Sequence, residues 1–460
     1  MRFRVYNILI ILMCAMADIS AIDKPSFKGK MEQSYFKLAE SNNDPFFQNE
    51  TSLQVNHFYY DFYLRYKYQA NDLPTAFYPV VYQSDMLTGD FTLKYKQFRS
   101  KFGYFYDSLG HGILFKSFKD PLVFTDTNLY GYALYQESDY LSAKYFTGNM
   151  RDKTSLRSAN VKAAELVFFP SSFSFGGSFL EYQLSENNDV DRLYSLLFST
   201  YLDWLDLDIE LARNHDNEHS YASYVSAVSQ LKHVTQVYNY TKYHSFLFRD
   251  SYNRLSLNQG PLGVYTHTFT LLSRLLPNLD MNNQESFRYG ISYQVSDSWM
   301  LSSVYSRHVT PFLYYDDFLI ESSLQNYWVF SSQSVLYSSQ TAGSRYYWNL
   351  VQASQIPINT RFSLDWDTEF QKQKYVDYSS MIHQLSFNIT KRYSIGFNLE
   401  TKSVNNSDTS WFAWILTMKT KQDTIQAYIG SQAAGKVCSG GVCIYQPEFD
   451  GIRINWQHSF

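Results

Sequence analysis

Apolar and polar side chains alternate along much of this chain, and residues 358–370 show the pattern clearly. In that stretch every second residue, from Ile358 to Phe370, is apolar or Thr. Because successive side chains of a β-strand point to opposite faces, the run predicts a strand with one apolar face and one wet face. The wet face would carry Arg361, Asp365, Asp367 and Glu369.

Two other runs repeat the alternation. Residues 205–212 set Asp206, Asp208 and Glu210 between aliphatic residues, and residues 91–96 set Lys94 and Lys96 between Phe, Leu and Tyr. A face with this many charges cannot contact hydrocarbon, so we expect these side chains to contact water. A soluble sandwich with one solvated face has the same alternation, so the pattern alone does not separate it from a membrane barrel.

The connections between the predicted strands alternate between short turns and longer polar stretches. Antiparallel barrels that cross an outer membrane have this arrangement, with tight turns at one end and longer loops at the other. The sequence therefore predicts an all-β protein, a transmembrane antiparallel up-and-down β-barrel of about 20 strands, within a range of about 18–22. Residues 250–283 and 311–343 are each long enough to contain a further hairpin.

Composition favours the barrel over the sandwich. Tyr (41) and Phe (36) account for most of an aromatic content of 18%, which suits the aromatic girdles at the two membrane interfaces. The mean hydropathy of −0.34 is too low for a helical membrane protein, whereas a barrel can place every second residue in a wet lumen. With a net charge of −4 and no basic stripe, nucleic acid is not an expected partner.

The N-terminal region predicts export. Arg2 and Arg4 precede an apolar run and a small-residue cleavage site, so residues 1–21 are interpreted as a signal peptide. Residues 22–50 would add a strand or form a periplasmic or lumenal piece, and residues 51–460 would form the barrel.

Two of the three cysteines, Cys438 and Cys443, stand outside that signal. In an oxidising compartment they predict a disulfide that fixes the shape of a loop; a metal-binding pair is the alternative, although no second His or Cys cluster accompanies it. No catalytic residue, metal site or cofactor is assigned from the sequence.

The final stretch, residues 449–460, alternates Ile452, Ile454 and Trp456 with polar residues and ends on Phe460. It resembles the closing strand of a Gram-negative outer-membrane β-barrel of the porin-like kind. This resemblance implies an outer-membrane location, contact with outer-membrane lipid, and recognition of Phe460 by the barrel-assembly machinery.

Two internal stretches resemble an uncharacterised family of such barrels. One is residues 103–114, with Gly110-His111-Gly112 at a proposed bend and an acidic stretch following. The other is a Cys-x-Gly-Gly-x-Cys motif before the last strand, matched by Cys438 and Cys443, with Ile444 where the family has Arg. The resemblance implies architecture and location and brings no established activity.

Residues 261–276 are too apolar to remain exposed as an external loop. They would form an extra lipid-facing hairpin or fold into the lumen; we favour inward folding, which would let Arg274 reach the acidic row from Asp365 to Glu369 and narrow the lumen.

The expected function is a non-enzymatic, passive, porin-like channel for small hydrophilic solutes. The alternative is a structural or interaction barrel with an occluded pore, serving as a surface receptor, adhesin or secretion-system partner and binding an envelope protein.

Overall fold

The computed structural model describes most of the chain, and the account below concerns these residues alone: 25–38, 46–70, 86–120, 125–151, 157–185, 189–248, 257–261, 263, 265, 269–274, 282–311, 314–326, 330–341, 345–374, 376–390, 392–439, 442–446 and 448–460. The predicted signal peptide, residues 1–21, lies outside them.

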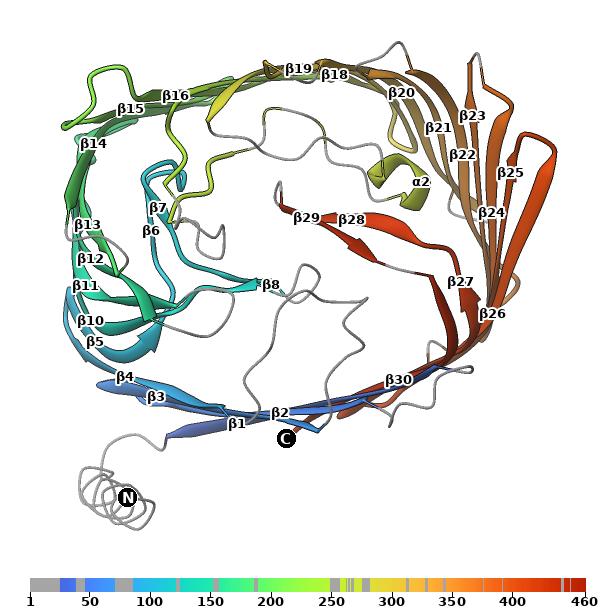
Figure 1. The fold of residues 1–460 in the computed structure, drawn as a ribbon, viewed down its shortest axis with the longest axis horizontal. Helices are drawn as coiled ribbons and strands as arrows, with labels where there is room; N and C mark the ends of the chain where they lie inside the picture. The colour runs from blue at the N-terminus through green and yellow to red at the C-terminus, as the bar shows by residue number, and fades with distance from the viewer. Residues whose placement is uncertain are drawn as a thin grey trace.

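One antiparallel sheet of 24 strands forms the wall of the protein (Figure 1). Its strands are β1 (Ser26–Leu38), β2 (Phe46–Asn56), β3 (Tyr60–Ala70), β4 (Met86–Tyr95), β5 (Phe98–Phe105), β10 (Leu129–Glu137), β11 (Leu141–Arg151), β12 (Arg157–Phe168), β13 (Phe173–Leu184), β14 (Val190–Leu202), β15 (Leu205–Asn214), β16 (Tyr221–Leu231), β17 (Val234–His244), β18 (Asn283–Ser296), β19 (Trp299–Val309), β20 (Tyr314–Asn326), β21 (Phe330–Thr341), β22 (Arg345–Pro357), β23 (Phe362–Gln373), β24 (Tyr378–Ile389), β25 (Tyr393–Val404), β26 (Ser407–Lys419), β27 (Asp423–Gln432) and β30 (Phe449–Ser459).

Each strand pairs with its neighbours in the order of the chain, and β1 pairs with β30 in a register that sets Lys30 opposite Ser459. The backbone N–H groups of Gly29 and Phe460 also donate to each other's carbonyl oxygens, at 2.7 and 2.9 Å. The first and last strands therefore have partners on both sides, which satisfies backbone groups that an open edge would leave exposed to lipid.

The prediction of about 20 strands was too low. Residues 22–50, left open between a strand and a lumenal piece, contain β1 and the first residues of β2, so the sheet begins before residue 51. Residues 311–343 contain the whole of β20 and β21. The apolar face of β1 is interrupted by Gly29 and Gln33, and its place in the sheet depends on pairing with β2 and β30, which side-chain alternation does not reveal.

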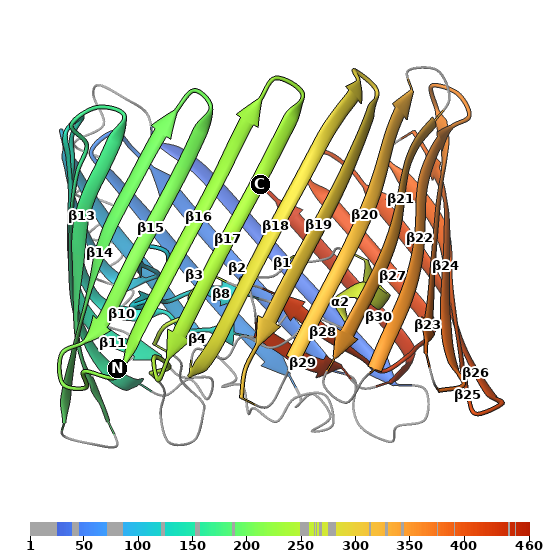
Figure 2. The same ribbon diagram turned by 90° about the horizontal axis from the view of Figure 1, so that it is seen from above.

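The two ends of the barrel differ (Figure 2). At one end the connections are short turns, such as residues 57–59 between β2 and β3 and residues 96–97 between β4 and β5. Ser26, opposite Asn56, and Phe460 lie at this same end. The longest connections, residues 106–128, 245–282 and 433–448, leave the opposite end.

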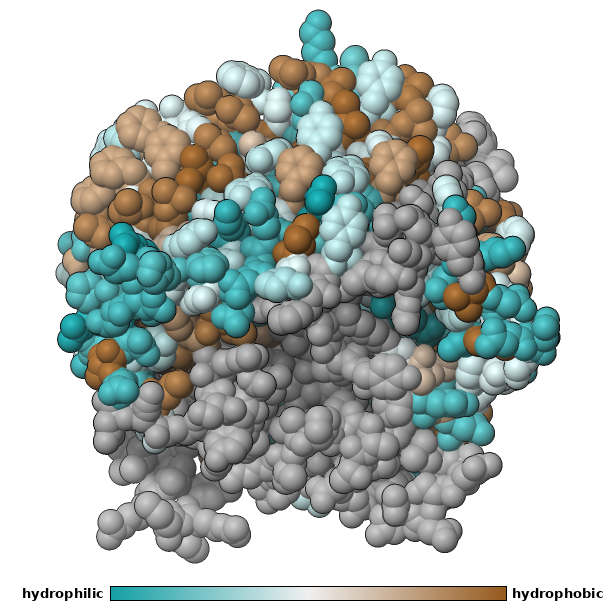
Figure 3. All heavy atoms as spheres, turned by 45° about the horizontal axis from the view of Figure 1, so that its top comes forward, coloured by the Kyte–Doolittle hydropathy of each residue, from teal (hydrophilic) through white to brown (hydrophobic). Residues whose placement is uncertain are grey.

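Apolar side chains cover much of the outer wall, as the brown groups along the upper part of Figure 3 show. Leu211 and Trp366, for example, are 51% and 47% exposed. Among the described residues, no helix has the length and hydropathy required to cross a membrane, a finding that does not bear on crossing by strands.

Candidate functional site in the barrel lumen

The described residues of three long connections turn inward and narrow the lumen (Figures 1 and 2). The first insert, residues 106–128, contains the short strands β6 (Ser108–Leu109), β7 (Phe115–Lys116), β8 (Lys119–Asp120) and β9 (Thr125–Asp126). The second insert, residues 245–282, contains the single-turn helix α2 (Thr270–Ser273). The third insert, residues 433–448, contains the hairpin β28 (Gly435–Ser439) and β29 (Val442–Gln446).

A buried arginine of the wall holds both ends of the first insert. Arg65, on β3, donates to Asp126 Oδ2 at 2.7 Å and to the Tyr106 hydroxyl at 3.3 Å. Tyr106 in turn donates to Asp126 Oδ1 at 2.8 Å. Burial works to raise the pKa of the Asp126 carboxyl, but the Arg65 charge and the hydrogen bonds that Asp126 accepts lower it. Asp126 is thus held ionised beside its cation.

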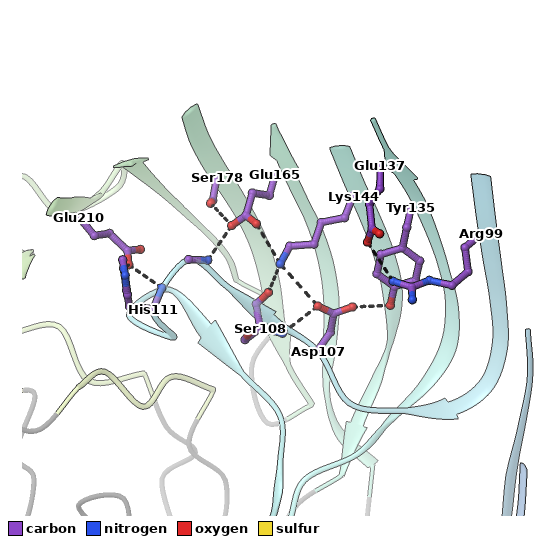
Figure 4. Close-up of polar contacts among 11 residues, drawn as sticks. Arg99, Asp107, Ser108, His111, Tyr135, Glu137, Lys144, Glu165, Ser178 and Glu210 are labelled. Atoms are coloured by element: carbon purple, nitrogen blue, oxygen red, sulfur yellow. Dashed lines mark hydrogen bonds and ion pairs between the residues drawn. The ribbon is translucent and has the colours of Figure 1, made fainter. Parts of the chain in front are cut away.

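A second polar network ties the start of the insert to strands β10 to β12 (Figure 4). The Tyr135 hydroxyl donates to Asp107 Oδ2 at 2.5 Å. Lys144 Nζ lies 3.7 Å from Asp107 Oδ1 and 3.0 Å from Glu165 Oε1, and it also donates to the Ser108 carbonyl. One ammonium group therefore neutralises two inward-facing carboxylates and fixes the insert backbone between them.

The tip of the first insert is held by two carboxylates (Figure 4). The Gly110 N–H donates to Glu165 Oε2 at 2.6 Å, and the His111 N–H donates to Glu210 Oε2 at 2.8 Å. His111 Nδ1 lies 3.1 Å from that same Glu210 oxygen. Gly110 has φ +50°, and a Cβ there would lie 2.7 Å from the Glu210 carboxylate, so glycine is required on both counts.

The environment of His111 favours its protonated form. Burial lowers the pKa of His111, but the hydrogen bond to Glu210 and the charges of Glu210, Asp208 and Glu165 outweigh it and raise the pKa. Residues 110–112, expected to mark a bend at the rim or toward the lumen, lie in the turn between β6 and β7 of the first insert.

The first insert also has an apolar underside. Leu109, Ile113, Leu114 and Phe115 have no exposed surface and pack in one cluster with residues such as Phe146 on the wall. Each fully buried side chain of this size contributes about 1.5–3 kcal/mol relative to exposure. The insert is therefore held by apolar packing as well as by ion pairs.

The second insert is hydrogen-bonded to the first. The Gln259 N–H donates to the Gly112 carbonyl at 3.1 Å, and the Lys116 N–H donates to the Leu257 carbonyl at 2.9 Å. The side-chain amide of Asn258, which is almost fully buried, donates to the Ile113 carbonyl at 3.0 Å. Two connections from different parts of the wall thus behave as one unit.

Further along the second insert, α2 docks on the part of the wall formed by β23 and β25. The Thr270 and Leu271 N–H groups donate to Glu369 Oε1 and Oε2 at 2.9 and 2.7 Å. Arg274 makes a bidentate pair with Glu400 on β25, at 2.6 and 3.2 Å. Residues 261–276, where they are described, therefore fold into the lumen. The partner of Arg274 is Glu400 and not the predicted acidic row from Asp365 to Glu369. Glu369 instead accepts the hydrogen bonds of the N–H groups at the start of α2.

The third insert lies against the second. A Cβ built on Gly435 would lie 2.5 Å from Arg274 Nε, which shows how closely β28 approaches that side chain. Cys438 and Cys443 stand directly opposite each other in the β28–β29 register. The disulfide itself remains a prediction.

Most predicted lumenal side chains lie on inward-facing strand positions. Glu210 and Glu369 contact the inserts, which places their rows, with Asp206, Asp208, Asp365 and Asp367, toward the lumen. Lys94 pairs with Asp61 at 2.6 Å.

Two of the predicted lumenal residues lie in turns and not on strands. Arg361 is exposed in the turn between β22 and β23, and Lys96 is exposed in the turn between β4 and β5 with φ +52°. Residues 358–361, expected to begin a strand, instead form a turn in which Asn359 Oδ1 accepts hydrogen bonds from the Arg361 and Phe362 N–H groups. Asn is a common initiator of such turns, so it was a usable signal.

Sequence reasoning did not select Arg65, Lys144, Glu165, Asp126 or Tyr135. The alternation of side chains between the two faces of a strand could have placed Arg65, Lys144 and Glu165 on inward faces, since each stands between apolar or aromatic residues. Nothing local to Asp126 indicates that it meets Arg65, which lies 61 positions away. Among the described residues, no group of three or more His, Cys, Asp or Glu side chains is arranged to hold a metal ion.

Comparison with known proteins gives a partial family match and a shared fold. A family of unknown function (DUF6029) matches residues 314–460. No curated protein sequence matches the chain significantly. Among solved structures, the chain resembles the E. coli P pilus tip assembly intermediate PapC-PapD-PapK-PapG, with a TM-score of 0.53 and 8% identity, over 94% of this chain and 60% of that chain.

Two further structures are similar at lower scores. The P pilus usher (PapC) translocation pore gives a TM-score of 0.46 and 8% identity, over 94% of this chain and 99% of that chain. The outer membrane protein opdK of Pseudomonas aeruginosa gives 0.39 and 10%, over 72% and 96%. At these identities a likeness shows the fold alone. Together with the topology of the sheet, it identifies the fold as that of an outer-membrane β-barrel.

Proposed function

We propose that this protein is a passive channel for small hydrophilic solutes in the outer membrane of a Gram-negative cell. The observation that carries the proposal is a ring of 24 strands whose inward positions bear charged and polar side chains. Antiparallel barrels of about 16 or more strands enclose an aqueous channel unless something fills it. The proposal includes no enzymatic step, metal or cofactor.

The two faces of the wall support the proposed membrane location. Apolar residues face outward, where lipid would cover them, and the short turns lie at the end that holds Ser26 and Phe460. In outer-membrane barrels that end is periplasmic and the longer loops are external. The proposal therefore places the end of the barrel from which the three inserts enter the lumen on the outer side. It also includes assembly through recognition of Phe460 by the barrel-assembly machinery.

The inserts would act as the selectivity constriction of this channel. They bring Asp107 and Arg274 into the lumen, where these side chains meet Lys144 and Glu400 of the wall. Charged side chains at a constriction set which solutes pass, and the backbone of the inserts sets the size limit. Because these charges are largely paired with one another, we propose weak discrimination by charge.

Conductance in planar bilayers tests the proposal. The intact barrel should give discrete conductance steps, and replacing residues 261–276 with a short Gly-Ser linker should increase their size. A linker replacement of residues 215–219, in the connection between β15 and β16, should leave the step size unchanged; Ser220 is kept because its hydroxyl donates to the Ser245 carbonyl of the second insert. If correctly folded protein gives no steps even after the 261–276 replacement, the channel proposal fails.

One observation favours a second candidate, a structural or interaction barrel with a filled pore. The first two inserts are hydrogen-bonded to each other and docked on different parts of the wall, as a stable plug would be. Absence of conductance together with repeated recovery of a stoichiometric envelope protein partner would support this alternative and not the channel.

A further inference from the structure

The lumenal wall contains a cavity of about 440 Å³ beneath the start of the first insert. Strands β2 to β5 and β10 form its walls, and Tyr106 and Asp107 of the insert form its roof. Its volume lies within the range of about 300–1,000 Å³ that small-molecule sites occupy. Unlike most such sites it is strongly polar, so its occupant must offer many polar groups.

The charged groups of the cavity are already neutralised by neighbours. Asp61 pairs with Lys94 at 2.6 Å, and Asp90 pairs with Lys101 at 3.5 Å. Asp107 accepts the hydrogen bond of the Tyr135 hydroxyl and lies near Lys144 (Figure 4). An ionic ligand would have to break one of these pairs, whereas an uncharged ligand would not.

The same groups keep unused hydrogen-bonding capacity. A carboxylate offers about four acceptor sites and an ammonium group three donors, and one ion pair uses only part of them. Asp61 Oδ1 is shielded from solvent and has no hydrogen-bond partner among the described residues.

Donors and acceptors lie side by side in this cavity, together with aromatic rings. Each hydroxyl group of a sugar is at once a donor and an acceptor, which matches paired ammonium and carboxylate groups better than a single charge does. Arg99 stacks 4.4 Å from the centre of the Tyr135 ring and also contacts Glu137 at 3.3 Å, so its guanidinium is held in a fixed orientation. Tyr63 and Tyr106 add aromatic surface to the lining.

We propose that this cavity, the sugar subsite, binds one unit of a neutral saccharide. The inference rests on the proposed channel function, because it names the class of solute that would pass through the lumen. Asp61, Asp90 and Lys101 would hydrogen-bond the hydroxyl groups, and Arg99 would supply a preset pair of donors. Asp107 is a positioning residue, since it holds the insert that forms the roof.

Isothermal titration of the full protein in detergent micelles tests the subsite. The probes are maltose, which is neutral, glucosamine, which is cationic, gluconate, which is anionic, and glycine, a zwitterion. We expect maltose to bind more tightly than the other three. Tighter binding of glucosamine, gluconate or glycine than of maltose, or no heat from maltose, would overturn the proposal.

Variants locate the binding. Asp61→Asn removes the ion pair with Lys94 and should weaken maltose binding roughly tenfold or more, the effect of losing one charge-assisted hydrogen bond. Asp203→Asn, the same change in an exposed turn between β14 and β15, should leave binding unchanged. If Asp61→Asn does not give the heat-modifiable folded form, Asp90→Asn serves in its place. Equal affinity in a folded cavity variant and in Asp203→Asn would place the sugar elsewhere.

Conductance separates this inference from the channel proposal. A barrel that conducts but binds no maltose would refute the sugar subsite and keep the channel. A barrel that binds maltose with the predicted variant pattern but never conducts would keep the subsite and refute the channel.

Discussion

The pair between Arg274 and Glu400 allows a quantitative test of how the second insert is anchored. Their side chains are only 18% and 4% exposed, and Arg274 Nη1 lies 2.6 Å from Glu400 Oε1. Arg274→Ala leaves the Glu400 carboxylate buried without its cation. Removing one member of a buried pair costs about 3–5 kcal/mol, mostly through the uncompensated charge.

Other contacts decide whether that loss releases the insert. The two N–H groups that donate to Glu369 contribute about 1.5–3 kcal/mol each as bonds to a charged acceptor, and the buried Leu271 and Leu272 contribute about 1.5–3 kcal/mol each. These contacts together exceed the loss. We therefore expect Arg274→Ala to leave α2 docked on average but to increase its transient opening by roughly 10²–10⁴-fold.

Hydrogen exchange measured by mass spectrometry on a peptide covering residues 269–274 should show this increase. The control is Arg213→Ala, which removes an exposed pair with Glu218 at 3.9 Å and should change exchange little, because such pairs contribute about 0–1 kcal/mol. Adding Glu400→Gln to Arg274→Ala should recover much of the protection, since no unpaired charge then remains. Identical exchange in Arg274→Ala and Arg213→Ala would refute the anchoring role.

The remaining predictions concern the first insert, the cysteines and the seam between the first and last strands. In the docked insert the pKa of His111 is raised, so protonated His111 stabilises docking fully below about pH 6.5 and less as the pH rises through the raised value. After correction for the base-catalysed intrinsic exchange rate, the protection of residues 109–115 against hydrogen exchange should therefore decrease at alkaline pH. Replacing Cys438 and Cys443 with Ser should change proteolysis of the third insert and leave the heat-modifiable barrel intact, because so short a loop yields little chain-entropy stabilisation. Gly29→Ala should lower the temperature at which the barrel unfolds, because the new Cβ would lie 1.9 Å from the Phe460 ring and overpacking costs about 1–3 kcal/mol.

Matched variants make these outcomes decisive. The alkaline loss of protection, corrected for the intrinsic exchange rate, should disappear in His111→Gln, and its persistence there would assign the pH effect to another group. Gly290→Ala is the control for the seam, since its Cβ would make only ordinary contacts, the nearest at 3.5 Å. Equal unfolding temperatures for Gly29→Ala and Gly290→Ala would show that the Phe460 ring moves aside at no cost.

The wall of the barrel could be predicted well from the sequence because strand alternation is a local property. The row of Asp206, Asp208 and Glu210 between aliphatic residues indicates its own inward face, whatever lies elsewhere in the chain. Local patterns fail at the ends of strands. The alternation of β23 continues into the preceding turn, so Arg361 was assigned to the lumen although the chain had already left the sheet.

Strand number was less predictable because it depends on pairing. The residues of β1 alternate imperfectly, and what holds them in the sheet is a set of backbone hydrogen bonds to β2 and β30, which are separated from each other by most of the chain. Backbone groups are the same in every residue type except proline, so they leave little trace in the sequence.

The lumenal site is hardest to predict because each of its contacts joins segments that are far apart in sequence. His111 meets Glu210 over 99 positions, and Arg274 meets Glu400 over 126. Composition can indicate that an apolar stretch such as residues 261–276 must be buried, as its described residues Leu271 and Leu272 are, but many inward carboxylates could accept an arginine there. Glu369 accepts hydrogen bonds from the N–H groups at the start of α2. Because this contact fixes the position of the helix, it also fixes which carboxylate Arg274 can reach, and that carboxylate is Glu400. The partner of the arginine is therefore set by the backbone of the insert and not by charge alone.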